Sequence, residues 1–137
     1  MKRVLIDTGP LVAILSPSER NHELCSSTLK NLPNPPITCW PVITEATWLL
    51  RRFPQAVRRL LASISVGIIE ILRVDSIEVD QIAMIMEQFA SLRPQFADAM
   101  LVYLAHRENI DTIFTLDRRD FSVYRTARKK AFRLLPE

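Results

Sequence analysis

Short apolar runs recur along the chain, and polar or amphipathic sequence separates each run from the next. The first run, Val4 to Ile6, ends at Asp7. Runs of this length that are rich in β-branched residues and bounded by turn formers are typical of buried β-strands. The pattern predicts four strands and a fifth near the end of the sequence, over residues 4–6, 37–40, 68–74, 112–116 and 132–135.

Helical patterns fill the segments between these runs. Thr8 and Gly9 offer a helix cap, and Pro10 suits the first helical position. A helix is predicted from Pro17 to Leu32, where the following prolines stop it. Further helices are predicted from Pro41 to about Arg51, around the stripe Val57, Leu60, Leu61 and Ile64, from Val79 to Phe89 behind a capping box at Asp75 and Glu78, and from about Gln95 to Glu108.

Strands that alternate with helices indicate an α/β fold. We expect a central parallel sheet of four to five short strands flanked by helices on both faces. The 137 residues correspond to one domain of ordinary size, and no linker or repeat divides them. We therefore expect a single domain over residues 1–137.

The composition excludes several classes of protein. The chain has 48% hydrophobic and 24% charged residues, as a globular protein does, but only two glycines, Gly9 and Gly67. A P-loop, a dinucleotide-binding turn and the flap of an aspartic protease all need more glycines than this. The chain therefore contains none of these three glycine-rich motifs.

The basic residues of the chain are mostly arginines. Arginine accounts for 14 of the 18 basic residues, and the formal net charge is +3. Because guanidinium groups bind phosphate and stack on bases, this balance favours a nucleic-acid partner. A basic surface that is merely solvated is the alternative.

The two cysteines and the N-terminal sequence indicate in which cellular compartment the protein is expected. Cys25 and Cys39 form no CxxC pair and have no matching histidines, so we expect buried thiols in a reducing environment and no zinc. The basic, apolar N-terminus imitates a signal peptide, but Asp7 and Pro10 interrupt it. No apolar run approaches the ~18 residues that a membrane span needs. We expect a cytoplasmic protein without membrane contact.

Four acidic residues are predicted to meet at one edge of the sheet. Asp7 ends the first strand, and Asp117 follows the fourth. Glu45 lies about one turn into the helix that leaves the second strand, and Asp98 lies near the start of the helix that leads to the fourth. Ligands of open parallel sheets bind at the carboxyl ends of the strands, so this edge is the candidate site.

Each acid also has a separate structural explanation. Asp7 can cap a helix, Asp98 can favour a helix dipole, and Asp117 and Asp120 can pair with neighbouring arginines on the surface. Glu45 lies on an apolar stripe, where a carboxylate without a partner is costly. One divalent cation accounts for all four acids together, because it relieves their repulsion. Ligation by oxygen alone selects Mg²⁺ or Mn²⁺.

Four motifs resemble those of the PIN-domain nucleases, and in particular the VapC-type toxins of type II toxin–antitoxin pairs. The motifs are IDTGPLVAIL, PVITEATWLL, FADAMLVYLA and TLDRRDF, in the family's order and over nearly the whole chain. The resemblance implies a single PIN domain with metal-dependent endoribonuclease activity. It also implies that the catalytic residues and metal ligands are Asp7, Glu45, Asp98 and Asp117.

The resemblance implies further residues and partners. Thr8 and Thr115 match hydroxyl positions that support the site in the family, and Asp120 matches an acid sometimes found at its rim. Members usually form homodimers and are inhibited by a small cognate antitoxin of the VapB type. We therefore expect a homodimer, an antitoxin and an RNA substrate.

The expected reaction is hydrolysis of RNA phosphodiesters to 5′-phosphate and 3′-hydroxyl ends. Ribonucleases that use the 2′-hydroxyl of the substrate need a general base and acid, most often histidine. His22 and His106 are the only histidines, and both are expected at the surface, away from the acids. Metal-assisted attack by water is the route that remains.

Residues beside the acids complete the expectations. Arg118 and Arg119 follow Asp117 directly and are expected to contact RNA phosphates. Trp40 and Trp48 are expected to pack in the core rather than to stack on bases. The alternative function is a PIN-fold RNA-binding or RNA-processing module outside a toxin–antitoxin pair.

Overall fold

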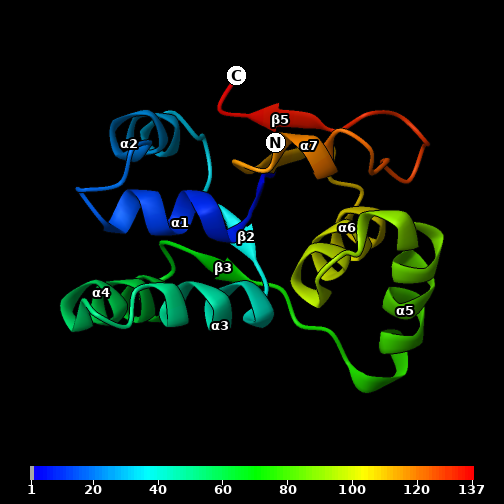
Figure 1. The fold of residues 1–137 in the computed structure, drawn as a ribbon, viewed down its shortest axis with the longest axis horizontal. Helices are drawn as coiled ribbons and strands as arrows, with labels where there is room; N and C mark the ends of the chain where they lie inside the picture. Colours follow the sequence, from blue (N-terminus) through cyan, green and yellow to red (C-terminus); the bar gives the residue numbers. More distant parts are fainter. Residues whose placement is uncertain (1) are drawn as a thin grey trace.

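The computed structural model describes residues 2–137 and contains a five-stranded sheet in which every pair of neighbouring strands is parallel (Figure 1). The strand order across the sheet is β3-β2-β1-β4-β5. This arrangement confirms the predicted α/β class. The strands are β1 (Leu5–Ile6), β2 (Ile37–Thr38), β3 (Glu70–Ile71), β4 (Thr112–Phe114) and β5 (Arg133–Leu135).

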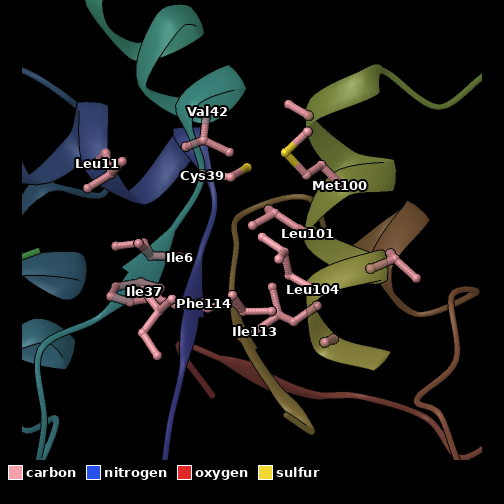
Figure 2. Packing of buried hydrophobic residues seen from close by; sticks show 14 of the residues in the cluster. Ile6, Leu11, Ile37, Cys39, Val42, Met100, Leu101, Leu104, Ile113 and Phe114 are labelled. Carbon is pink, nitrogen blue, oxygen red and sulfur yellow. The ribbon is translucent and has the colours of Figure 1, made fainter. Parts of the chain in front are cut away.

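Helices cover both faces of this sheet. Figure 2 shows Leu11 on one side of the strands and Leu101 and Leu104 on the other. The α-helices are α1 (Thr8–Leu15), α2 (His22–Lys30), α3 (Trp40–Leu49), α4 (Pro54–Ser65), α5 (Val79–Gln88), α6 (Phe96–Glu108) and α7 (Arg118–Phe121), with short 3₁₀ helices η1 (Ser76–Glu78) and η2 (Ala90–Leu92).

The chain changes direction across the sheet at its central strand. From β1 it continues to β2 and β3 on one side, and later to β4 and β5 on the other. Leu5 pairs with Ile113 and Ile6 with Phe114, and the Asp7 amide donates to the Phe114 carbonyl at 2.9 Å. In open parallel sheets such a switch point leaves a crevice outside the carboxyl ends of the two strands. Residues that follow β1 and β4 therefore face one another.

Helix α6 is buried around most of its circumference. Every residue from Ala99 to Ala105 is buried, and Leu101 and Leu104 have no exposed surface (Figure 2). Helix α5 packs along α6 on the side away from the sheet. A helix that is enclosed in this way holds its first turn, which carries Asp98, in a fixed position.

A polar network joins η1 to α6. The Glu78 carboxylate accepts hydrogen bonds from the Tyr103 hydroxyl at 2.5 Å, the Asp75 amide at 2.8 Å and the Arg107 guanidinium at 2.8 Å. These bonds, that of Tyr103 first, lower the pKa of Glu78 to about 2. Glu78 occupies the position that the predicted capping box assigned to it. The network thereby links the segment before α5 to the helix that carries Asp98.

The first two helices differ from their predicted bounds. Helix α1 begins at Thr8 rather than at Pro10, because Asp7 is its N-cap and accepts a hydrogen bond from the Thr8 amide. The helix predicted from Pro17 to Leu32 is confined to His22–Lys30, and turns occupy the residues before it. The apolar spacing that predicted this helix was correct only for its second half.

The prediction that both tryptophans are buried was wrong. The exposed fractions of Trp40 and Trp48 are 54% and 63%. Strand β2 ends at Thr38, so Trp40 opens α3 instead of closing a buried strand. Trp48 lies on the outer side of α3, where the Arg51 guanidinium stacks over its ring at 3.9 Å from the centroid. Both aromatic rings are therefore part of the protein surface.

Two other expectations concern thiols and membranes. Cys25 and Cys39 are free and buried, as predicted. Burial, with smaller contributions from Asp7 and Asp98, raises the pKa of Cys39 to about 12. Among residues 2–137, no helix combines the length and the apolar character needed to cross a membrane.

Candidate active site

Acidic side chains from four segments line one pocket at the switch point. The pocket has a volume of about 470 Å³. Its walls include the four predicted acids, which come from the end of β1, from α3, from α6 and from the turn before α7. We call it the acidic pocket; its carboxylates are Asp7, Glu45, Asp98, Asp117 and Asp120.

Asp7 is fixed at the base of the acidic pocket. Only 7% of its surface is exposed. One carboxylate oxygen accepts from the Thr8 amide at 2.8 Å, and the other accepts from the Thr115 hydroxyl at 2.9 Å. Burial raises the pKa of Asp7; the two hydrogen bonds oppose this, and the charges of Glu45 and Asp117 raise it further. Asp7 thus caps helix α1 and also belongs to the acidic pocket, so its structural and functional explanations hold together.

Glu45 is held by a threonine from another helix. The Thr8 hydroxyl donates to a Glu45 carboxylate oxygen at 2.7 Å. Val42 and Ala46, on the same side of α3, are fully buried, whereas Leu49 is half exposed and lines the pocket. Glu45 therefore lies on the apolar side of α3 but lines the acidic pocket, where the Thr8 hydroxyl is its hydrogen-bond partner.

Asp98 lies in the first turn of α6, between the buried residues Ala97 and Ala99. Burial, followed by the negative charges of Asp7 and Asp117, raises the pKa of Asp98 from 3.8 to about 7. A hydrogen bond from the Gln95 backbone acts in the opposite direction. The metal-free pocket thus disfavours a full set of ionised carboxylates near neutral pH.

Asp117 caps the short helix α7. Its carboxylate accepts from the Asp120 amide at 3.1 Å, and its own amide donates to the Thr115 hydroxyl at 3.0 Å. Thr115, which is fully buried, therefore contacts Asp7 and Asp117 simultaneously. Both threonines singled out from the sequence thus hold carboxylates of the acidic pocket.

The two arginines that follow Asp117 do not line the acidic pocket. The Arg118 guanidinium donates to the Pro136 carbonyl, and Arg119 is exposed. Within residues 2–137, the cationic side chain that does line the pocket is Arg93. Its backbone is left-handed, with φ of 51°, immediately before Pro94 and the helix that carries Asp98. No motif in the sequence singles out Arg93.

The histidines are engaged elsewhere, as expected. The His22 ring donates to the Ala13 carbonyl at 2.7 Å, and the His106 ring donates to the Arg125 carbonyl at 2.7 Å. Neither ring lines the acidic pocket. Among residues 2–137, no imidazole therefore lines the pocket to act as a general base or acid.

The donor chemistry of the acidic pocket fits a hard divalent cation. The oxygen donors in its lining include five carboxylates and the Thr8 hydroxyl, and oxygen ligands are those that Mg²⁺ and Mn²⁺ prefer. Burial and, after it, the negative charges of Asp7 and Asp117 raise the pKa of Asp98, and a bound cation would neutralise this negative charge. Within residues 2–137, however, no three acidic, histidine or cysteine side chains are already gathered as ligands. Binding would have to draw the carboxylates closer together.

A buried tyrosine adjoins these acids. The Tyr124 ring packs edge-on against Phe89 and Phe121. Its hydroxyl is buried and has no hydrogen-bond partner among the described residues. Burial, followed by the charge of Asp98, raises the pKa of Tyr124 above its ordinary value. The sequence carries no local signal for this position, because packing between α7 and the segment after α5 creates it.

Comparisons with known proteins identify the family and the fold of the chain. The family model of the PIN domain matches residues 4–129. Ribonuclease VapC26 of Mycobacterium tuberculosis is 30% identical over 135 residues, which are 97% of this chain and 100% of the relative. The crystal structure of VapC20 of Mycobacterium tuberculosis, a sarcin–ricin loop cleaving toxin, matches with a TM-score of 0.77. That match covers 85% of this chain and 91% of the other at 16% identity, and it shows the fold.

Proposed function

The chain belongs to the PIN-domain family of VapC-type ribonucleases, and we propose that it is the toxin of a VapBC-type toxin–antitoxin pair. We propose further that one PIN domain spans residues 1–137 and hydrolyses RNA with Mg²⁺ or Mn²⁺ in the acidic pocket. The observation that carries this proposal is the convergence of four carboxylates from four segments at the switch point of the sheet.

The residues that would hold the metal and carry catalysis are Asp7, Glu45, Asp98 and Asp117. A bound Mg²⁺ or Mn²⁺ supplies Lewis-acid stabilisation of the phosphate and lowers the pKa of a water molecule. Thr115 holds Asp7, and Thr8 holds Glu45, so each carboxylate is restrained in the acidic pocket before cation or substrate binds. Asp120 lines the same pocket and is proposed as a supporting acid.

The positions of the histidines support the proposed product ends. Both rings are bonded to backbone carbonyls outside the acidic pocket, so no histidine is placed to activate a 2′-hydroxyl there. Attack by water leaves a 5′-phosphate and a 3′-hydroxyl and makes no use of the 2′-hydroxyl as a nucleophile. The catalytic contribution of the chain is then to position charge rather than to exchange protons through imidazole.

The product ends give a direct test. Cleavage of an end-labelled RNA oligonucleotide in Mn²⁺ is expected to give fragments with 5′-phosphate and 3′-hydroxyl ends, read by mass spectrometry. EDTA is expected to stop cleavage, and Mn²⁺ added in excess is expected to restore it. Fragments with 2′,3′-cyclic phosphate ends, or cleavage that persists in EDTA, would contradict the proposal.

Thr115 provides a test of how the carboxylates are positioned. Thr115→Val keeps the shape of the side chain but leaves a buried Asp7 oxygen and the Asp117 amide without their partner. We expect the free energy of unfolding, from urea titration, to fall by about 1–3 kcal/mol, and cleavage per folded molecule to fall as well.

Thr112 offers a matched control on β4. It is as fully buried as Thr115, but its hydroxyl donates to Asp111, which lies outside the acidic pocket. Thr112→Val is expected to retain cleavage per folded molecule. Equal activities of the two variants would remove Thr115 from the proposed machinery.

The proposed partners have support on the surface of the molecule. Large apolar side chains are exposed along α3, α4 and the loop between them. Surfaces of this kind on soluble proteins usually bind other proteins. We propose that a second copy of the chain and a VapB-like antitoxin use such surfaces, in the cytoplasm where RNA is available. The exposed apolar residues are Trp48, Leu49, Phe53, Leu61 and Val66.

An RNA-binding or RNA-processing module outside a toxin–antitoxin pair is the second candidate. The arginine content favours it as much as it favours a nuclease. A pure binding module has no need of several carboxylates in one pocket, because they repel one another and weaken the attraction for RNA. The nuclease is therefore the function that the acidic pocket supports best.

A further inference from the structure

A second cavity adjoins the acidic pocket. It has a volume of about 740 Å³, and Leu116 lines both cavities. The two residues after Leu116 divide between them, because Asp117 lines the acidic pocket and Arg118 lines the second cavity. Leu116 therefore belongs to the lining of two neighbouring cavities of different chemistry.

Arginines from three separate segments line this second cavity, which we call the arginine cavity. Arg20 belongs to the turn before α2, Arg118 begins α7, and Arg133 lies on β5. These three elements occupy the same side of the molecule in Figure 1. Glu137 is the acidic side chain in its lining and pairs with Arg133. The arginine cavity thus has a surplus of positive charge, next to a pocket with a surplus of negative charge.

The three arginines differ in how far the fold uses them. Arg118 donates to the Pro136 carbonyl, and Arg133 bonds to Glu137, so both contribute to the position of the last strand. Within residues 2–137, Arg20 has neither a hydrogen bond from its side chain nor an ion pair. A guanidinium that lines a cavity and has no intramolecular partner is free to bind an anion.

We propose that the arginine cavity binds backbone phosphates of the RNA strand next to the phosphate in the acidic pocket. RNA carries one negative charge per nucleotide, so a strand that crosses Leu116 brings further phosphates to Arg20. Guanidinium groups bind phosphate oxygens through paired hydrogen bonds and do so for any base sequence. This inference rests on the proposed function, and it adds Arg20 and Arg133 to the RNA contacts proposed for Arg118.

Arg20 is the residue on which the test depends, because its substitution breaks no intramolecular bond. We expect Arg20→Gln to raise the dissociation constant for a single-stranded RNA oligonucleotide about five-fold at low salt. The slope of log affinity against log salt concentration should become shallower by ~0.7, the value for one lost phosphate contact. Fluorescence anisotropy measures both in metal-free buffer, with Asp98→Asn in every protein so that no RNA is cut.

Two further variants make the result specific. Arg20→Lys keeps the charge and is expected to keep the salt slope. Arg58 is an exposed arginine of α4 that lines neither cavity. Arg58→Gln is therefore expected to leave both the dissociation constant and the salt slope unchanged. A salt slope for Arg20→Gln equal to that of Arg58→Gln would overturn the proposal.

Cleavage assays separate this inference from the proposed function. In the active chain, Arg20→Gln is expected to raise KM with kcat unchanged, because the contact persists from substrate to transition state. Metal-dependent cleavage with no effect of Arg20→Gln would overturn the arginine cavity and leave the nuclease in place. The opposite result can also be distinguished. If the chain cuts no RNA in Mn²⁺ but Arg20→Gln still weakens RNA binding, the nuclease is overturned and the RNA-binding role of the arginine cavity stands.

Discussion

Asp98→Asn is expected to abolish RNA cleavage without unfolding the protein. Asparagine keeps the shape of the side chain but removes one of the charges that would hold the metal. If that charge supports about 4 kcal/mol of transition-state stabilisation, its loss lowers kcat/KM by ~1,000-fold. Single-turnover cleavage of labelled RNA in Mn²⁺, beside a circular dichroism spectrum of each protein, gives the measurement.

Asp7→Asn is expected to give the same loss by the same cause. Asparagine caps a helix about as well as aspartate, so the start of α1 should survive the change. Asp80→Asn is the matched control, because Asp80 is exposed at the start of α5 and lies outside the acidic pocket. Wild-type cleavage by the Asp98 or the Asp7 variant would show that the reaction takes place elsewhere.

The meeting of four acids in one pocket could be foreseen from the sequence because it depends on local signals and on one rule of topology. Asp7 and Asp117 follow apolar runs that were recognisable as strands, and parallel strands end at the same edge. Asp98 lies in the first turn of its helix, and Glu45 lies near the middle of the short helix that follows β2. These positions required no knowledge of which strands are neighbours.

The surroundings of the acids could not be foreseen, because they depend on contacts between distant segments. Arg118 was placed beside the acids on the ground that it follows Asp117, yet consecutive residues of this turn face different cavities. Arg93 reaches the acidic pocket through a left-handed turn, which an arginine gives no reason to expect. Arg20 and Arg133 line one cavity only because the fold brings the turn before α2 near β5.

Trp40 and Trp48 show a second limit of sequence reasoning. Large apolar side chains give the same signal whether the chain itself or a partner covers them. Trp40 was expected in a short buried strand and Trp48 beside apolar neighbours of a helix, and the fold leaves both exposed. Periodicity therefore located the helices, but it could not assign every helix face to the core.

The stability of the metal-free protein is expected to fall as the pH rises from about 4 to about 7. Asp98 has an ordinary pKa of 3.8, which is raised to about 7 in the folded chain, and the pKa of Asp7 is raised as well. In this interval the unfolded chain has already lost protons that the folded chain still holds. The free energy of unfolding therefore decreases with pH, and the penalty is complete above pH ~7.

Acidic groups with lowered pKa values make the free energy of unfolding increase with pH, and they do so at lower pH than the acidic pocket. The pKa of Glu78 is lowered to about 2, so its contribution is complete above its ordinary value of 4.5 and is lost only as the pH falls toward 2. The decrease between pH 5 and 7 should therefore come from the acidic pocket. Asp98→Asn removes one of the two carboxyl groups with a raised pKa and is expected to flatten the dependence in part, with a higher melting temperature than wild type near pH 8.

Divalent cations are expected to reverse this penalty in the wild-type chain alone. A ligand at 100 times its dissociation constant adds ~2.7 kcal/mol to stability, which for a domain of this size is roughly 10 °C in melting temperature. Melting curves at pH ~5 and ~8, each in EDTA and in Mn²⁺, should show the largest shift for wild type at pH ~8, where the carboxylates are ionised. Because Asp98→Asn removes a proposed ligand, an equal Mn²⁺ shift in that variant would place the metal outside the acidic pocket.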